Sequence, residues 1–249
     1  MEYRYIAGSS FGKDSIATIL TAIEHKEPLD AVLYCEVMFD EDVSGEVPEH
    51  RQFIYNVAIP WVESHGIPVI KVKSERTYLD VFYQKIRKSS NPQLVGKYSG
   101  FPLAGRCCIQ SRCKARTLER YMKKSLTGNV MKYIGISADE RQRLQRLAPG
   151  QISLLAKYGI GKEQAMRMAK AAGLLSPIYG FARRSGCWFC PYASERELMH
   201  LRQHHPKLWY RLLELGKEDI ATKRFNRSYT VFELEKKLEQ YFMEKNNII

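Results

Sequence analysis

Five of the six cysteines in this chain fall into two short segments whose spacing suits metal binding or redox chemistry. They are Cys107, Cys108 and Cys113 in GRCCIQSRCK, and Cys187 and Cys190 in GCWFCP. A C-x-x-C pair can turn both thiolates towards one metal, and alone it fits zinc, an iron-sulfur cluster or a redox-active dithiol. The tandem pair upstream makes a shared metal site the stronger interpretation.

The first segment offers one thiol more than a pair needs. Adjacent residues in an extended chain point apart, so Cys108 with Cys113 is an alternative to the tandem pair Cys107 and Cys108. A helix beginning near Ile109 would separate 108 and 113 by about one and a half turns, which is poor geometry for one site. We therefore prefer the tandem pair. Cys113 is then a nearby thiol, an alternative ligand or a sulfur-carrying nucleophile, and Cys35 is expected to be an ordinary buried thiol.

The segment SSFGKDS, residues 9–15, has the composition of a phosphate-binding loop. It lies between a predicted strand and a predicted helix, so backbone N–H groups at the helix N-terminus face an incoming anion. Gly12 allows close approach of a ligand, Lys13 adds positive charge, and Ser10 and Ser15 can donate hydroxyl hydrogen bonds. The loop is not a Walker A motif, which requires GxxxxGK[ST].

The elements that must position these residues alternate between strand and helix in the first half of the chain. The predicted strands are 3–9, 31–37, 67–72 and 130–137, and the predicted helices are 14–25, 48–64, 79–87 and 113–124. This alternation indicates a parallel sheet covered on both faces. We predict an α/β fold with a doubly wound parallel sheet, organised as a nucleotide-binding domain at 1–147 and a helical C-terminal region at 148–249 that carries the C-x-x-C.

The C-terminal region reads as helices and loops. A helix is predicted at 161–173, capping boxes begin at Ser194 and Thr230, and the last helix has an apolar stripe. The stripe comprises Leu234, Leu238, Tyr241 and Phe242. His204 and His205 precede Pro206 and are expected to end a helix rather than to catalyse a reaction.

Composition narrows the partners. The net charge of +12 and the pI near 9.4 favour an anionic partner, such as a nucleotide or a nucleic acid. Basic residues are frequent near the cysteines in the sequence, where they could hold an anionic cluster and substrate or simply form a solvated face. They are Arg106, Arg112, Lys114, Arg116, Arg120, Arg183 and Arg184. No apolar run approaches the roughly 20 residues of a membrane span, so we expect a cytoplasmic protein with reduced thiols and no membrane partner.

Several motifs together resemble the PP-loop superfamily of ATP pyrophosphatases and adenylylsulfate or phosphoadenylylsulfate (PAPS) reductases. SFGKDS is similar to the family's SxGxDS motif. MFDEDVSGEVPEH at 38–50 and YIGISADERQR at 133–143 resemble two later segments of the reductases, with Ser137 where an arginine is common. GLLSPIY and RRSGCWFCP are typical of an iron-sulfur branch carried by phages and Gram-positive bacteria. The resemblance covers about residues 1–195.

The resemblance implies a fold, a cofactor and site residues. The fold would be that of the adenine nucleotide alpha hydrolases, and Cys107, Cys108, Cys187 and Cys190 would ligate a 4Fe-4S cluster, with zinc as the alternative. Ser10, Gly12, Lys13, Asp14 and Ser15 would hold ATP or an adenylylated sulfate. From their local positions alone, Asp40 or Glu140 is expected to help to bind Mg²⁺, and Arg143 to neutralise charge on the phosphate. Lys13, Asp14, Cys113 and Arg143 are the candidate catalytic residues.

The favoured function is that of an ATP α/β-cleaving, adenylating sulfurtransferase. The sulfur acceptor would be a nucleic acid or a small molecule, and a sulfur donor protein and a second copy of the chain are further candidate partners. An adenylylsulfate or PAPS reductase is the alternative, but no cysteine follows Cys190, so Cys113 would have to replace the family's C-terminal cysteine. A third interpretation is a non-catalytic nucleotide- or nucleic-acid-binding protein with structural zinc, in which Trp188 packs or stacks on a base.

Overall fold

The chain forms two compact units, each assembled from separated segments. The computed structural model describes residues 3–102, 107–125 and 128–245. The first unit comprises Met1–Glu36, Glu46–Lys73 and Thr117–Ser185, and the second comprises Val37–Gly45, Ser74–Arg116 and Gly186–Ile249. The units are therefore not divided at residue 147 as predicted. Local strand and helix patterns identify elements, but they do not show that the chain leaves the first unit twice and returns to it.

The first unit is built on a parallel five-stranded sheet with the order β3-β2-β1-β5-β6. The strands are β1 (Tyr3–Ser9), β2 (Ala31–Glu36), β3 (Val69–Lys73), β5 (Asn129–Ile134) and β6 (Gln151–Ile152). Every residue of β2 is buried, as its continuous apolar sequence predicts for a strand covered on both faces. The predicted strand at 130–137 is not the last, because the two-residue β6 pairs with it.

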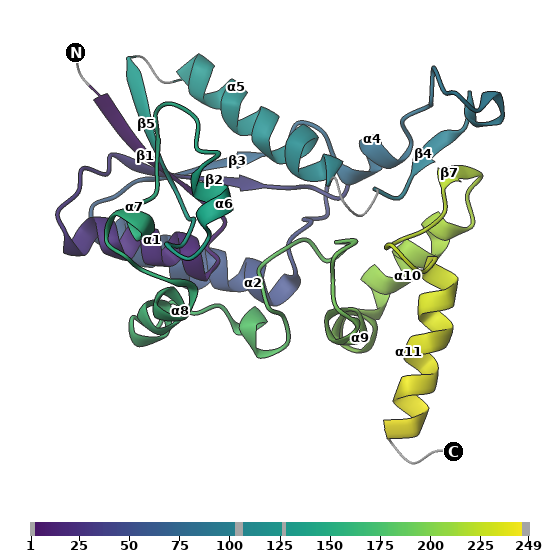
Figure 1. Cartoon of the computed structure of the whole chain (residues 1–249). Helices are drawn as coiled ribbons and strands as arrows, with labels where there is room; N and C mark the ends of the chain where they lie inside the picture. The colour runs from purple at the N-terminus through teal and green to yellow at the C-terminus, as the bar shows by residue number, and fades with distance from the viewer. Residues whose placement is uncertain (1–2, 103–106, 126–127, 246–249) are drawn as a thin grey trace. The chain divides into compact units, whose positions relative to one another are not determined.

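Helices cover both faces of this sheet (Figure 1). One face packs against α1 (Lys13–Glu24), the helical stretch from α2 (Pro48–Phe53) to α3 (Ile59–Ser64), and α8 (Lys162–Ala171). The other face, formed by Ile6, Ala31 and Leu33, packs against apolar residues of α5 (Arg116–Ser125). Right-handed crossovers demand this change of face, because the strand order reverses direction at β1. The predicted doubly wound α/β fold is confirmed.

Proline explains why the predicted helix at 48–64 is not regular throughout. A π-helical segment, η1 (Ile54–Ala58), separates α2 from α3. Pro60 has no N–H to donate to the preceding turn, and a locally widened turn accommodates that missing hydrogen bond. The helix therefore continues to Ser64, but with an altered register of backbone hydrogen bonds.

The second unit combines helices with a two-stranded parallel sheet, β4 (Tyr98–Gly100) and β7 (Ile220–Thr222). Its helices are α4 (Tyr78–Phe82), α9 (Glu195–His204), α10 (Pro206–Gly216) and α11 (Val231–Lys245). The capping boxes at Ser194 and Thr230 are confirmed by reciprocal hydrogen bonds with Glu197 and Glu233. In α11, Leu234 and Leu238 are buried, but Tyr241 and Phe242 are 52% and 37% exposed, so only half of the predicted stripe packs inward.

The predicted helix at 79–87 was too long. A capping box of Thr77 with Asp80 begins α4, which ends at Phe82. Beyond it, Gln84 and Ile86 exchange backbone hydrogen bonds with residues 96–99, so these residues form an extended arm instead of further helical turns. No helix that the structure describes combines the length and apolar character needed to cross a membrane.

Candidate functional site

The phosphate-loop candidate occupies the turn between β1 and α1, as its sequence position predicts. Ser9 Oγ accepts a hydrogen bond from the backbone N–H of Phe11 at 2.9 Å, and Ser15 Oγ donates to the carbonyl of Gly12 at 3.0 Å. Phe11 has a φ of 51°, a left-handed conformation that is strained for an aromatic residue. Its side chain is fully buried, with its ring centroid 5.6 Å from that of Tyr34, and this packing holds the strained turn.

The N-terminus of α1 offers unsatisfied donors to an anion. Gly12 is the residue that precedes the helix, and it provides no side-chain cap. The positive end of the helix dipole therefore faces the loop without a side-chain cap from the preceding residue, which is the arrangement that binds phosphate at helix N-termini. Lys13 and Asp14 add side chains at the same end, with 2.5 Å between Lys13 Nζ and Asp14 Oδ1.

Tyr179 covers part of this donor set. Its hydroxyl accepts a hydrogen bond from the backbone N–H of Lys13 at 2.8 Å. A methyl group at Gly12 would lie 3.1 Å from the Tyr179 hydroxyl oxygen and 2.5 Å from Ser185 Oγ. The hydroxyl thus takes the place that an oxygen of a bound phosphate would occupy on the Lys13 N–H.

A buried histidine that the sequence analysis missed supports the loop. The side chain of His50, on α2, is fully buried, with Nε2 2.9 Å from the carbonyl oxygen of Ser10 and Nδ1 2.8 Å from Ser176 Oγ. It therefore fixes the loop to the segment that precedes Tyr179. No local pattern marks His50, because its two partners are 40 and 126 residues away in the chain.

The end of β5 lies against the same loop. A methyl group at Gly135 would be 3.0 Å from the backbone nitrogen of Ser15 and 3.1 Å from the carbonyl carbon of Asp14, so any larger residue would press on the start of α1. In open parallel sheets, ligands bind where neighbouring connections leave in opposite directions, and β1 and β5 flank that point here. The topology and the loop chemistry therefore indicate the same place for an anionic ligand.

Glu140 and Arg143 lie after β5 and bind each other. Arg143 Nη1 is 2.8 Å and 2.9 Å from the two carboxylate oxygens of Glu140, and Lys162 Nζ is 3.6 Å from one of them. Burial opposes ionisation, but the hydrogen bond and charge of Arg143 hold the pKa of Glu140 below its ordinary value. The carboxylate is thus paired with cations, and its predicted role as a Mg²⁺ ligand stays a prediction.

Asp40 belongs to the second unit, whereas the phosphate loop belongs to the first. Its carboxylate forms an ion pair with Arg211 and accepts backbone N–H groups from Asp42 and Val43. Burial opposes ionisation, but the Val43 N–H and the Arg211 guanidinium lower the pKa of Asp40. These contacts give Asp40 a structural function in the turn at residues 40–43, and its role towards Mg²⁺ stays a prediction.

All the cysteines of the two segments belong to the second unit. The C-x-x-C loop is anchored by Trp188, whose backbone N–H donates to the carbonyl of Gly45 at 3.0 Å and whose indole N–H donates to that of Ser44 at 2.9 Å. Within the loop, the Cys190 N–H donates to the Cys187 carbonyl at 3.1 Å. Trp188 is 3% exposed, so it serves as a packing residue and not as an open stacking platform.

Cys113 differs from the other cysteines of these segments in being fully buried. Its Sγ donates to the carbonyl of Thr77 at 3.7 Å, and burial raises the pKa of the thiol to about 12. Cys107, Cys108, Cys187 and Cys190 are partly exposed. This contrast supports the tandem pair as ligands and weakens the case for Cys113 as a nucleophile, because the thiolate is the reactive form.

The donor set fits a thiolate-ligated metal centre. Burial raises the pKa of Tyr78, and charge on Cys108, Cys107 and Cys187 raises it further, so both cysteine segments act on this one side chain. Four thiolates from such segments suit an iron-sulfur cluster or zinc, and they do not suit Mg²⁺ or Ca²⁺. Burial raises the pKa of Cys108, and the charge of Arg112 offsets part of this effect. Arg106 lies outside the described residues.

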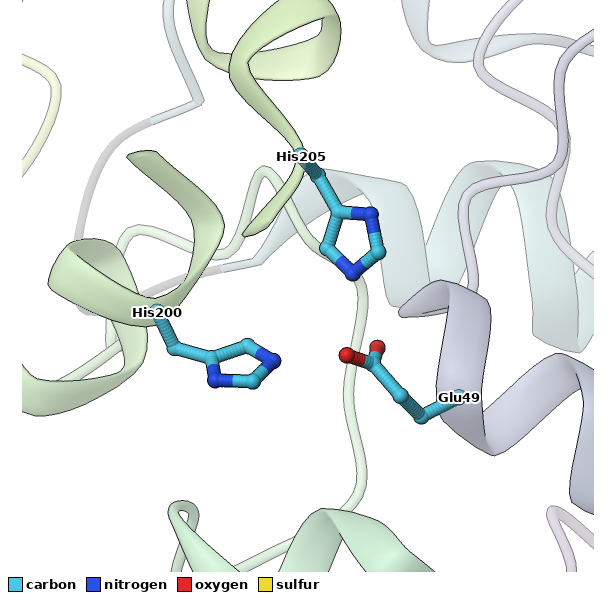
Figure 2. Close-up of side chains that lie close together, drawn as sticks. All are labelled: Glu49, His200 and His205. Atoms are coloured by element: carbon cyan, nitrogen blue, oxygen red, sulfur yellow. The ribbon is translucent and has the colours of Figure 1, made fainter. Parts of the chain in front are cut away.

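The histidines near Pro206 end a helix, as predicted. α9 ends at His204, and His205 precedes Pro206 at the start of α10. Figure 2 shows the side chains of His200 and His205, whose ring centroids are 5.9 Å apart within the second unit. Glu49, also labelled there, is a residue of α2 in the first unit.

The chain was compared with family models, curated proteins and solved structures. The chain is similar to the U34-tRNA thiolase NcsA from Methanococcus maripaludis with its [4Fe-4S] cluster, with a TM-score of 0.43 and 16% sequence identity, over 95% of this chain and 81% of that one. No family model and no curated protein matches the sequence.

Proposed function

We propose that the chain is a PP-loop enzyme that adenylates an acceptor with ATP and then transfers sulfur to it, using a 4Fe-4S cluster. The observation that carries the proposal is the uncapped N-terminus of α1, which SFGKDS spans at the point where the strand order of the sheet reverses. The thiols of the second unit supply a second kind of chemistry that a plain nucleotide-binding protein does not need.

The first half of the proposed reaction uses the phosphate loop. An acceptor oxygen forms a bond to the α-phosphorus of ATP as the bond from that phosphorus to the bridging oxygen breaks, and pyrophosphate leaves. The loop N–H groups and Lys13 stabilise the negative charge that develops on pyrophosphate, with Mg²⁺ neutralising the rest. A sulfur nucleophile then displaces AMP from the adenylated acceptor.

The second half depends on the cysteine segments. Cys107, Cys108, Cys187 and Cys190 are the proposed cluster ligands, and a bound cluster would supply a site at which sulfide is held for transfer. The net charge of +12 supports an anionic acceptor such as a nucleic acid, with a small molecule as the other class. Sulfur itself must come from a donor protein or from free sulfide.

The properties of Cys113 favour sulfur transfer over sulfate reduction. A reductase needs a nucleophilic cysteine to attack the sulfate sulfur, and Cys113 is the only candidate in the absence of a cysteine after Cys190. Its thiol is fully buried and its pKa is raised to about 12, so it is protonated at neutral pH. A protonated, buried thiol is a poor nucleophile.

Two measurements on anaerobically purified protein test the proposal. We expect iron and acid-labile sulfide in about equal amounts with a broad absorbance near 400 nm. We also expect the protein to release pyrophosphate from ATP when acceptor is present. Stoichiometric zinc without sulfide would show that the site holds structural zinc and not a cluster. Sulfite release from adenylylsulfate would support the reductase alternative instead.

Replacing Tyr179 with phenylalanine should tighten the binding of pyrophosphate. The ligand no longer has to displace the Tyr179 hydroxyl from the Lys13 N–H, and a hydrogen bond of about 1 kcal/mol corresponds to roughly a fivefold lower Kd. Isothermal titration calorimetry with pyrophosphate measures the effect. Tyr158→Phe is the matched control, because its hydroxyl binds Glu27 in the same unit. Weaker binding by Tyr179→Phe would show that the hydroxyl contacts the ligand directly.

A further inference from the structure

The hydroxyl of Tyr78 is buried without a hydrogen-bond partner among the described residues. Tyr78 is the first residue of α4, held by the Thr77 cap and by a hydrogen bond from its own N–H to the carbonyl of Met38 at 2.9 Å. The side chain is 0% exposed, so water does not satisfy the hydroxyl. Buried polar groups are nearly always hydrogen-bonded, and one that is not calls for an explanation.

Aromatic packing holds the Tyr78 ring in place. Its centroid lies 5.2 Å from that of Phe39, with the rings stacked at 15°, and 4.2 Å from that of Phe189. Trp188 extends the same cluster, with its centroid 4.6 Å from that of Phe39. The ring therefore cannot turn outward to hydrate its hydroxyl without breaking this packing.

The same residue is tied to both cysteine segments. Its neighbour Thr77 accepts the hydrogen bond of Cys113, and its ring packs on Phe189, which lies between Cys187 and Cys190. Burial raises the pKa of Tyr78 well above its usual value, and charge on Cys108, Cys107 and Cys187 raises it further. Towards a thiolate a phenol O–H can only act as a donor, because a thiolate has no proton to give.

We propose that the Tyr78 hydroxyl is a built-in hydrogen-bond donor to a thiolate ligand of the metal centre held by Cys107, Cys108, Cys187 and Cys190. Tyr78 is thus a positioning residue, and the inference rests on the thiolate site of the proposed function. Donation to a ligand sulfur stabilises the more negative, reduced state and raises the reduction potential. In the metal-free protein the hydroxyl has no hydrogen-bond partner among the described residues, so its desolvation is uncompensated.

The variant Tyr78→Phe tests the inference because its effect should depend on the metal. In metal-free protein, loss of an unsatisfied buried hydroxyl should raise Tm by about 2–4 °C, measured by thermal denaturation. In cluster-loaded protein, the same substitution should make the reduction potential more negative, measured by redox titration followed by electron paramagnetic resonance. If the Tyr78 hydroxyl donates to a different group, Tyr78→Phe should produce neither effect.

Tyr83→Phe is the matched control. Tyr83 lies in the same unit next to α4, but its hydroxyl donates to Glu218 at 3.3 Å. Its removal should leave the reduction potential unchanged and should not raise Tm. The proposal is overturned if Tyr78→Phe and Tyr83→Phe have the same potential as the unmodified protein.

Cobalt separates failure of this inference from failure of the proposed function. If the protein holds no iron and sulfide, the cluster of the proposed function is wrong, and Co²⁺ bound to the thiolates becomes the probe. Tyr78→Phe should then move the thiolate-to-cobalt charge-transfer band to lower energy, because the sulfur becomes more electron-rich. An unmoved band, or a protein that binds neither iron nor cobalt, overturns the inference.

Discussion

Replacing Cys187 with alanine is expected to lower the iron content of the purified protein by at least about tenfold. Removing a metal ligand should weaken metal binding more than removing a residue that only holds a ligand in place. Cys187 opens the C-x-x-C loop that Trp188 anchors to Ser44 and Gly45, and these anchoring bonds do not involve its side chain. The loop should therefore keep its fold while the site loses one thiolate. Iron and sulfide analysis after anaerobic reconstitution measures the loss.

Cys113→Ala and Cys35→Ala are the control variants, because they show whether loss of any cysteine lowers the iron content. Both remove a fully buried thiol; Cys113 adjoins the site, and Cys35 lies in β2 of the other unit. We expect both variants to retain iron, since Cys113 donates its proton to Thr77 rather than offering a thiolate. Loss of iron in Cys113→Ala together with its retention in Cys107→Ala would instead make Cys108 and Cys113 the first ligand pair.

Local signals predicted the sheet and the phosphate loop well. β1 has the predicted bounds, since an apolar strand followed by glycine and serine is unambiguous, and the loop follows it directly. Periodicity also gave α1 and α8 to within two residues. These elements depend on hydrophobic patterning and turn chemistry, both of which are visible within a short window of sequence.

The features that could not be predicted depend on partners distant in the chain. His50 supports the phosphate loop through Ser10 and Ser176, and Tyr179 reaches the N–H of Lys13 across 166 positions. The left-handed conformation of Phe11 could not be predicted either, because the neighbouring Gly12 is the residue expected to adopt it. Packing of the Phe11 ring against Tyr34 holds Phe11 in that conformation instead. Such contacts are fixed by tertiary packing, which no local propensity records.

Replacing Lys13 with alanine should reduce the rate of pyrophosphate release from ATP by about 100-fold, which corresponds to about 2.7 kcal/mol of lost transition-state stabilisation. Lys13 stands at the first position of α1, where charge on the leaving pyrophosphate meets the helix dipole. The side chain of Lys13 is 12% exposed, so its charge acts with little screening by water. Steady-state kinetics with Mg·ATP measures the change.

The fold should tolerate this substitution, which makes the kinetic result interpretable. The side chain of Asp14, the ion-pair partner of Lys13, is 29% exposed, and its carboxylate can be solvated when the lysine is removed. Lys170→Ala, an exposed change on α8 in the same unit, is the control and should leave the rate unchanged. A raised KM with unchanged kcat would assign Lys13 to ground-state binding alone, and an unchanged kcat/KM would exclude it from the reaction.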